Sequence, residues 1–409
     1  MKNKLIVISF IFTGMWAQGQ VNSLYSSYGL GVVQLRDNNL FAGMGGATMA
    51  LKSGYTISDL NPASYAGINS EQLMMELAFK GSSLRYISGS NHVTGSNLTF
   101  EKAALGINLF DKVGTVVGLR RYSSVSYNSM VAKSLEGSEN IMSDYIEGTG
   151  GMNLFYIGSG FQIVKNLSLG LTGGYMFGSL RRTDEMVTDA GYATIFENNV
   201  FHNKLYWNAG MQYDIKMGKG LLTLGGMVQP EVTLNRVRDF YIRDSDDETL
   251  FSEEGHSMDD FRFPLQWGAG LAFKKGKSTL SLDMVAQQWK DVAYRGSNFY
   301  AQDLKNYALG YKYTKLRRTW YGIREGASFM AGLQYENGYL VIKDQQYPSM
   351  LFSLGLSLPS LNKGLLYSMV FRGGQRGTSS TNGFKEKFFD VTFTFGLFNQ
   401  MNRKGYKYD

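Results

Sequence analysis

The fold is decided by a pattern that is clearest in FDVTFTFGL, residues 389–397. Apolar side chains take every odd position of this segment, and polar or small residues take every even position. Because successive side chains of a strand point to opposite faces of a sheet, the pattern predicts a strand with one apolar face and one polar face. The same alternation recurs at residues 166–180, 277–289 and 348–358.

Fourteen segments of this kind follow the first seventy residues. They lie near residues 72–88, 97–110, 113–130, 150–164, 167–182, 199–215, 221–238, 261–274, 278–290, 303–313, 326–337, 348–358, 364–372 and 384–398. An even number of alternating segments, most of them ten or more residues long, predicts an all-β fold, a 14-stranded antiparallel transmembrane β-barrel at residues 71–398. A soluble β-sandwich or propeller is the alternative, and it would bury its apolar face in a common core.

The composition fits many glycine-interrupted strands. The 409 residues include 49 glycines, 26 phenylalanines and 26 tyrosines, with five prolines and 18% charged residues, which argues against disorder and against a helical bundle. There is no cysteine, so the chain has no disulfide framework and no thiolate metal site. A formal net charge of +7 is too small to indicate nucleic-acid binding.

Residues 1–19 have the composition of a secretory signal peptide. Lys2 and Lys4 precede the apolar run of residues 5–12, and the small residues Ala17 and Gly19 follow it. We expect cleavage after Gly19 and a mature protein that leaves the cytoplasm.

The connections between the fourteen segments alternate between short turns and long loops. Every second gap is a short turn, and these are residues 111–112, 165–166, 216–220, 274–277 and 359–363, with residues 314–325 as a long exception. The intervening gaps include the long segments 131–149, 183–198, 239–260 and 373–383. Outer-membrane barrels have short periplasmic turns and longer outer loops, so the gaps predict an N-terminus on the periplasmic side and a periplasmic C-terminal tail at residues 399–409.

Residues 20–70 do not alternate. FAGMGGATMA, residues 41–50, looks like a small-residue helix start, and DLNPAS, residues 59–64, looks like a turn. Small residues here let the segment pack closely inside a crowded lumen.

At these residues the sequence resembles the long-chain fatty acid transporter family of outer-membrane barrels. The motif that carries the resemblance consists of Gly43, Gly45, Gly46, Asp59, Asn61, Pro62 and Ala63, and segments 307–311, 332–335 and 352–355 resemble late strands of the family. The chain also resembles a related branch that includes the type IX secretion shuttle barrel. It departs from the family by continuing to Asp409 past the last strand, in a style typical of Bacteroidota barrels. The resemblance implies a fourteen-stranded barrel whose lumen is plugged by an N-terminal hatch, here residues 20–70.

If the resemblance holds, an apolar ligand enters from outside and needs a greasy slot and a cation for its head group. Phe41, Met44 and Met49 are candidates for the slot, with plain anchoring of the plug as the alternative. The candidate cations stand in adjacent pairs near the outer ends of strands, Arg120 with Arg121 and Arg181 with Arg182. Contact with lipopolysaccharide phosphates is the alternative for each of these arginines.

The sequence predicts no enzyme, no metal site and no cofactor. Three scattered histidines, His92, His202 and His256, come without a recognisable serine motif. The carboxylates of residues 244–260 lack the spacing of a calcium loop, which favours a solvated exterior loop.

The leading hypothesis is passive uptake of hydrophobic small molecules, such as long-chain fatty acids, through the bacterial outer membrane. The alternative is a scaffold barrel that docks secreted or surface proteins, or forms a subunit of an envelope protein-export or assembly complex. Expected partners are outer-membrane lipid and lipopolysaccharide, a hydrophobic small-molecule ligand and other envelope proteins, but no nucleic acid. Transport predicts an apolar pocket and a wall opening near the hatch, whereas a scaffold predicts a polar, sealed lumen.

Overall fold

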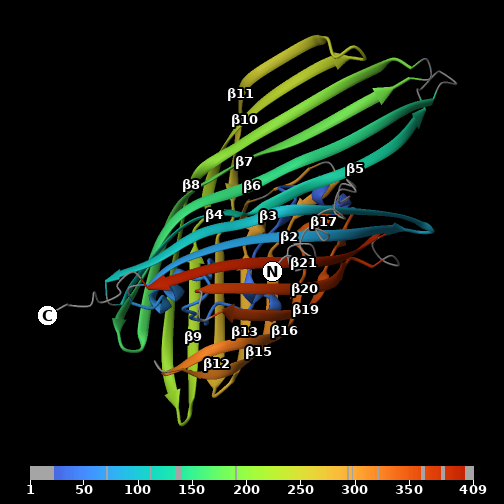
Figure 1. Ribbon diagram of the computed structural model, residues 1–409. Coiled ribbons are helices and arrows are strands. Elements are labelled where there is room, and N and C mark those ends of the chain that lie inside the picture. Colours follow the sequence, from blue (N-terminus) through green and yellow to red (C-terminus); the bar gives the residue numbers. More distant parts are fainter. Residues whose placement is uncertain are drawn as a thin grey trace, which may run out of the picture.

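Fourteen antiparallel strand pairings close on themselves in the computed structural model. The structure describes residues 23–70, 72–110, 112–134, 141–188, 191–292, 294–296, 298–319, 322–360, 364–378 and 383–400. The predicted signal peptide and most of the predicted C-terminal tail lie outside these residues. Around the ring the strands run β2, β3, β4, β6, β7, β8, β9, β12, β13, β15, β16, β19, β20 and β21, and β21 pairs with β2 again. The predicted 14-stranded barrel is confirmed (Figure 1).

The bounds of the elements are as follows. The strands are β1 (Val32–Val33), β2 (Gln72–Ser88), β3 (Asn91–Phe110), β4 (Val113–Arg121), β5 (Ser123–Ser134), β6 (Ile141–Val164), β7 (Leu167–Val187), β8 (Ala193–Met217), β9 (Gly220–Gln229), β10 (Val232–Asp244), β11 (Thr249–Phe263), β12 (Gln266–Lys275), β13 (Ser278–Gln287), β14 (Phe299–Ala301), β15 (Leu304–Thr319), β16 (Gly322–Glu336), β17 (Leu340–Ile342), β18 (Gln345–Gln346), β19 (Ser349–Ser360), β20 (Leu365–Arg376) and β21 (Lys385–Gln400). Four 3-10 helices are η1 (Leu24–Ser27), η2 (Leu40–Met44), η3 (Pro62–Gly67) and η4 (Trp289–Val292).

The alternating pattern sorts side chains to the two sides of the wall. On β21, Phe389 and Phe395 are 51% and 47% exposed on the outside, whereas Thr392 and Thr394 are buried inside. An apolar exterior and a polar interior are what a barrel in lipid requires. No helix in the described residues is long and apolar enough to cross a membrane.

Several strands run further than the alternation predicts. The predicted long gap at residues 314–325 is wrong, because β15 continues to Thr319 and β16 begins at Gly322. The predicted outer loops 131–149, 183–198 and 239–260 are also largely strand. The reason is physical: a sheet segment that is wet on both faces has no apolar side, so its sequence shows no period of two.

These extensions form a surface that we call the outer sheet. It consists of β5, β10, β11, residues 141–150 of β6, residues 180–187 of β7 and residues 193–203 of β8. The strands pair in the order β5, β6, β7, β8, β10, β11. Figure 1 shows them extending together beyond the other barrel strands.

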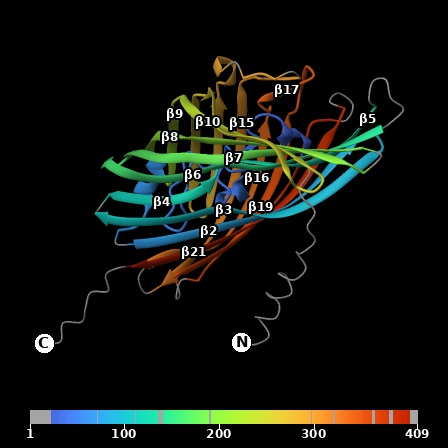
Figure 2. The same cartoon turned by 90° about the horizontal axis from the view of Figure 1, so that it is seen from above.

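Residues 23–70, which we call the N-terminal segment, lie inside the ring. Its helix η3 contacts β4, β6, β7 and β8, whereas η2 contacts β15, β16, β19 and β20 on the other side of the ring. A segment that touches opposite walls must cross the lumen. Figure 2 shows it in blue, enclosed by the strands.

Candidate functional site: a cavity beside a wall opening

The glycine motif of the N-terminal segment seats η2 flat against the wall. Gly45 ends η2 with a φ of 65°, a left-handed conformation that favours glycine. The Gly43 position lies against Gly355 of β19, where an added Cβ would come within 3.0 Å of the Gly355 Cα. The Ser353 hydroxyl accepts a hydrogen bond from Gly45 N at 3.0 Å and donates one to Gly43 O at 3.1 Å. Glycine therefore allows backbone and wall to touch here.

Asn61 and Pro62 start η3 and hold it against the barrel wall. Asn61 is the N-cap of η3, and its Oδ1 accepts a hydrogen bond from Ala63 N at 3.1 Å, with Pro62 at the first helical position. The Asn61 amide also donates to Met211 O of β8 at 3.1 Å. One side chain thus both starts the helix and ties it to the wall.

A buried ion cluster joins the N-terminal segment to β2 and β3. Lys102 Nζ lies 2.8 Å from Asp59 Oδ2 and 2.9 Å from Glu76 Oε1, and it donates a 2.6 Å hydrogen bond to Ile57 O. Tyr156 of β6 donates to the other oxygen of Asp59 at 2.5 Å. The three charged side chains are each at most 4% exposed. Removing one partner from such a group leaves an uncompensated buried charge, so the packed segment depends on all three side chains being present.

A second buried pair lies across the lumen. Arg36 Nη1 lies 3.4 Å from Asp283 Oδ2 of β13. The same carboxylate oxygen accepts hydrogen bonds from Thr48 N at 2.6 Å and Met49 N at 2.7 Å. Asp283 therefore binds both a side chain and the backbone of the N-terminal segment.

Asp37 makes the stability of the packed N-terminal segment depend on pH. Burial, reinforced by the nearby Asp59 carboxylate, raises the pKa of Asp37 to about 6. Its carboxyl group accepts hydrogen bonds from the Ser58 hydroxyl at 2.8 Å and from Asp59 N at 3.2 Å. Because the folded state favours the protonated form, Asp37 stabilises the packed segment below about pH 4, and this contribution is lost as the pH rises through 6.

We therefore expect the N-terminal segment to be protected better at pH 5 than at pH 7.5. A shift of about two pKa units corresponds to at most about 3 kcal/mol. The measurement is hydrogen exchange of residues 40–60, corrected for the intrinsic pH dependence of exchange. Asp37→Asn should flatten the profile, and an unchanged slope in that variant would show that another group is responsible.

A bulge in β3 bends this strand away from its neighbour. Lys102 pairs with Ala78 of β2, but Phe100 pairs with Phe79, so Glu101 is an extra residue. As a result two successive charged side chains, those of Glu101 and Lys102, are buried inside the ring. Pairing between β3 and β4 ends at Lys102, and residues 91–101 of β3 pair with β2 alone.

The barrel wall has an opening between β3 and β5. The unpaired part of β3 is one border, and a break between β4 and β5 makes the other border. Arg121 pairs with Asn153 of β6 and Val125 pairs with Gly150, so four steps on one strand face three on the other. Gly150 and Gly151 have φ values of 115° and 143°, which favour glycine. The two bulges together separate β3 from β5 and open the wall.

The N-terminal segment occupies part of this opening. Its β1 residues Val32 and Val33 pair with Ser124 and Ser123 of β5. At Ser126, the backbone O accepts from Ser23 N at 3.1 Å and the backbone N donates to the Ser26 hydroxyl at 3.2 Å. The edge of β5 is therefore satisfied by the N-terminal segment where β3 no longer lies beside it.

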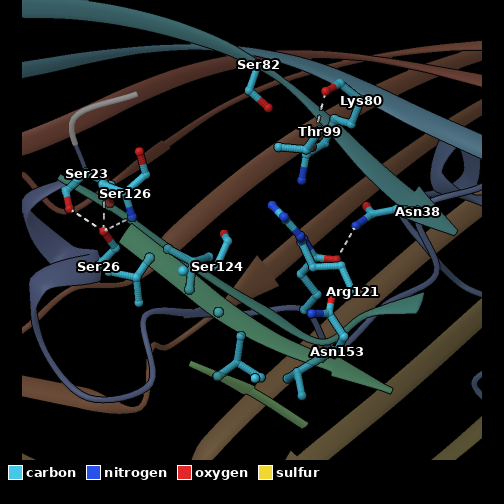
Figure 3. A pocket seen from close by; sticks show the side chains of 18 of the residues that line it. Ser23, Ser26, Asn38, Lys80, Ser82, Thr99, Arg121, Ser124, Ser126 and Asn153 are labelled. Carbon is cyan, nitrogen blue, oxygen red and sulfur yellow. Dashed lines mark hydrogen bonds between the residues drawn. The ribbon is translucent and has the colours of Figure 1, made fainter. Parts of the chain in front are cut away.

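A cavity of about 860 Å³ lies behind the opening, with residues 32–36 and Asn38 of the N-terminal segment along one side. Its wall is rich in hydroxyl, amide and charged groups, including Ser82, Asn97, Thr99, Arg121, Ser124, Ser126, Asn153, Arg372 and Arg376. Figure 3 shows Ser82 and Thr99 facing Arg121, Ser124 and Ser126 across it. The volume is that of a ligand pocket, and the lining mixes these polar groups with apolar side chains, including Leu84, Phe177, Phe201, Leu351 and Phe388.

Besides Arg36 with Asp283, three ion pairs of the barrel strands border the cavity. Lys80 Nζ lies 2.9 Å from Glu101, Arg372 lies 3.2 Å from Asp390 and Arg376 lies 3.1 Å from Glu386. In contrast, Arg121 has no ion pair closer than 4 Å among the described residues. The cavity thus offers one cation whose charge is not matched by a direct partner.

Of the residues predicted to bind a ligand, only Arg121 lines the cavity. Phe41, Met44 and Met49 are at most 2% exposed, pack against the barrel wall and do not line the cavity. Arg120 lies over the Tyr122 ring at 5.5 Å, whereas Arg121 lines the cavity. Ligand binding by any of them stays a prediction.

Arg181 and Arg182 lie on the outer sheet. Arg181 pairs with Glu197 at 3.2 Å and Arg182 with Asp184 at 3.0 Å, and both side chains are about half exposed. The sequence analysis missed Glu101 and Lys102. Two adjacent charges inside an alternating apolar strand are the signal that could have indicated them.

Within the described part of the chain, no group of three or more histidine, aspartate or glutamate side chains is placed to hold a metal ion. The carboxylates of residues 244–260 belong to the β10–β11 hairpin and its turn. His202 lies on β8 and His256 on β11, where it lies 3.2 Å from Glu253.

The closed fourteen-stranded ring has the same fold as solved hydrocarbon channels. The P. putida toluene transporter TodX matches with a TM-score of 0.63 at 13% identity, over 90% of this chain and 99% of that one. The monoaromatic hydrocarbon channel CymD matches with 0.57 at 14% identity, over 90% and 98%. A Pseudomonas aeruginosa FadL homologue matches with 0.58 at 11% identity, over 91% and 100%. These identities establish a shared fold.

Sequence places the chain more narrowly. The model of the BamG family matches residues 1–408, so this protein belongs to the BamG family. No curated protein sequence matches the chain. The predicted likeness to fatty acid transporters is confirmed for the fold, while the predicted Bacteroidota branch stays a prediction.

Proposed function

We propose that this protein is an outer-membrane barrel that docks another envelope protein on its outer side and does not conduct through its lumen. The observation that carries the proposal is the N-terminal segment, which crosses the ring and is held by two sets of buried ion pairs. Moving the segment out of the lumen would require all of these buried contacts to break together. The cavity beside the segment also has charged, amide and hydroxyl groups among its apolar side chains, whereas a hydrocarbon needs a predominantly apolar slot.

The outer sheet supplies a surface for such a partner. It has two free edges among the described strands, since β11 pairs with β10 alone and β5 pairs with β6 and with two residues of β1. Between Asp239 and Asp260 it carries nine carboxylates against one basic residue, Arg243. Charges on an edge strand discourage two copies of the same chain from pairing edge to edge, so the sheet is suited to a different protein.

Passive movement of hydrophobic small molecules is a second candidate. It is favoured by the opening between β3 and β5, through which a small apolar molecule could leave sideways into lipid. The solved neighbours TodX and CymD, which are described as a toluene transporter and a hydrocarbon channel, support it through their fold alone.

Site-specific cross-linking separates the two functions. Because the chain has no cysteine, a single Asp246→Cys variant carries a cross-linker at the turn of β10–β11. We expect one envelope protein to be captured in near-stoichiometric yield from whole cells, and purified protein to contain no stoichiometric lipid by mass spectrometry. The matched control is Lys219→Cys, in the short turn between β8 and β9, which should capture nothing comparable.

Uptake into proteoliposomes tests the second candidate directly. Labelled oleate or toluene should enter vesicles containing the protein no faster than vesicles without it. Faster entry, together with no protein captured at the outer sheet, would overturn the docking function.

A further inference from the structure

We propose that the opening between β3 and β5 receives an extended strand of a partner polypeptide, with a carboxylate of that strand facing Arg121. The inference rests on the proposed docking function and names what enters the barrel wall. It is carried by free strand edges, by the part of this chain already paired at the opening, and by the chemistry of the cavity.

Each border of the opening is a strand edge that is unpaired on the side of the opening. Residues 91–101 of β3 pair with β2 on one side, and no described strand pairs with the other side. Residues 127–134 of β5 pair with β6 and with no other described strand. Each free edge presents backbone N–H and C=O groups, which form a template for an added strand.

The N-terminal segment shows that this edge accepts an extended chain. It pairs antiparallel with β5 at Ser123 and Ser124, and Gln34 N donates to Tyr122 O at 2.8 Å. The last contact is at Ser126, after which the β5 edge is free. A partner strand would continue along β5 beyond Ser126, or add to β3 across the opening.

The side chains at the opening define the pattern of that strand. On β3, Leu98 is 49% and Phe100 is 38% exposed, whereas Asn97 and Thr99 line the cavity. A strand added beside β3 follows the same alternation, with apolar side chains outward and polar side chains toward the cavity. This is the pattern of a barrel strand rather than that of a fatty acid chain.

The cavity holds polar groups that such a strand would complete. Asn97 Oδ1 and Arg372 Nε are buried without a hydrogen-bond partner. Hydroxyl side chains on the cavity face of the added strand can donate to Asn97 and accept from Arg372. Arg121, which lacks a direct ion pair, then meets an acidic side chain, whereas a hydrocarbon would leave all three groups unmatched.

A defined peptide tests this in the full-length protein in lipid nanodiscs. The probe is a fluorescent ten-residue peptide of alternating valine and threonine, with one central threonine replaced by aspartate. We expect saturable binding that slows hydrogen exchange in residues 91–101. Methylation of alternate peptide nitrogens on the edge-pairing side should weaken binding at least tenfold, because it removes the backbone hydrogen bonds while keeping the side chains.

The contact between Arg121 and the peptide carboxylate is tested by changing each partner alone and then both together. Arg121→Gln, or aspartate to asparagine in the peptide, should each weaken binding about tenfold, and the two together should weaken it no further. The control is Arg262→Gln, a half-exposed arginine on β11 outside the cavity, which should bind the peptide normally. The N-methylated peptide on the unaltered protein keeps the test valid if Arg121→Gln does not fold.

Three outcomes would overturn the inference. They are equal binding of the N-methylated peptide, unchanged exchange in residues 91–101, and protection of those residues by oleate but not by the peptide. If the peptide fails while Asp246→Cys still captures a partner, the docking function stands and only the strand-insertion site is wrong. If the capture fails as well, the docking function is wrong too.

Discussion

Lys102→Met should raise the population in which the N-terminal segment is open to solvent by two to three orders of magnitude. The substitution leaves Asp59 and Glu76 buried without the ammonium group that lies within 2.9 Å of both. Removing one partner from a buried ion group costs about 3–5 kcal/mol, because the remaining charges lose their compensation.

The natural absence of cysteine provides the measurement. Thr48 is fully buried in the N-terminal segment, so Thr48→Cys reports each opening by its reaction with a water-soluble thiol reagent. The matched control is Lys274→Met, which breaks the pair with Glu325 where the lysine is 51% exposed. Such a pair contributes about 1 kcal/mol or less, and labelling should change only a few-fold. Equal labelling rates in the two variants would show that the cluster does not hold the segment.

Gly170→Val should displace η3 from the wall. A Cβ at Gly170 would overlap the backbone of Pro62 and Ala63, and a backbone held by the Asn61 cap cannot move aside as a flexible side chain can. Overpacking of this kind costs about 1–3 kcal/mol and more where nothing can relax. We expect at least a tenfold faster labelling of Thr48→Cys and faster proteolysis of residues 50–70.

Gly173→Val is the control, on the same strand three residues away. Nothing lies within 4 Å of a Cβ at Gly173, and valine suits a strand better than glycine does. This variant should keep a closed N-terminal segment and a barrel that resists unfolding in detergent. Normal labelling in Gly170→Val would mean that η3 does not press against β7 in solution.

The interior of the N-terminal segment was partly predictable from its own residues. Gly43, Gly45 and Gly46 predicted close packing, and Asn61-Pro62 predicted a turn, because the conformations of glycine and proline are local properties. The partner of Asp59 was not predictable in this way. Lys102 is 43 positions further along the chain, and only the register of β3 brings it there.

The cavity depends on still longer-range relations. Its lining comes from the N-terminal segment and from strands all around the ring. The Glu101 bulge decides which β3 side chains enter it, and a bulge shifts alternation by one residue without any change in composition. Sequence spacing alone therefore could not show that Arg121 lines the cavity while Arg120 lies against Tyr122.

The sequence by itself determined the fourteen strands and their inside and outside faces, because lipid on one side and a polar interior on the other impose a period of two on every strand between them. Tertiary structure alone decided the outer sheet and the wall opening. A strand that is wet on both faces leaves no period of two in the sequence. The opening exists because β3, which bulges at Glu101, does not pair with β5, which follows a break in register at Tyr122.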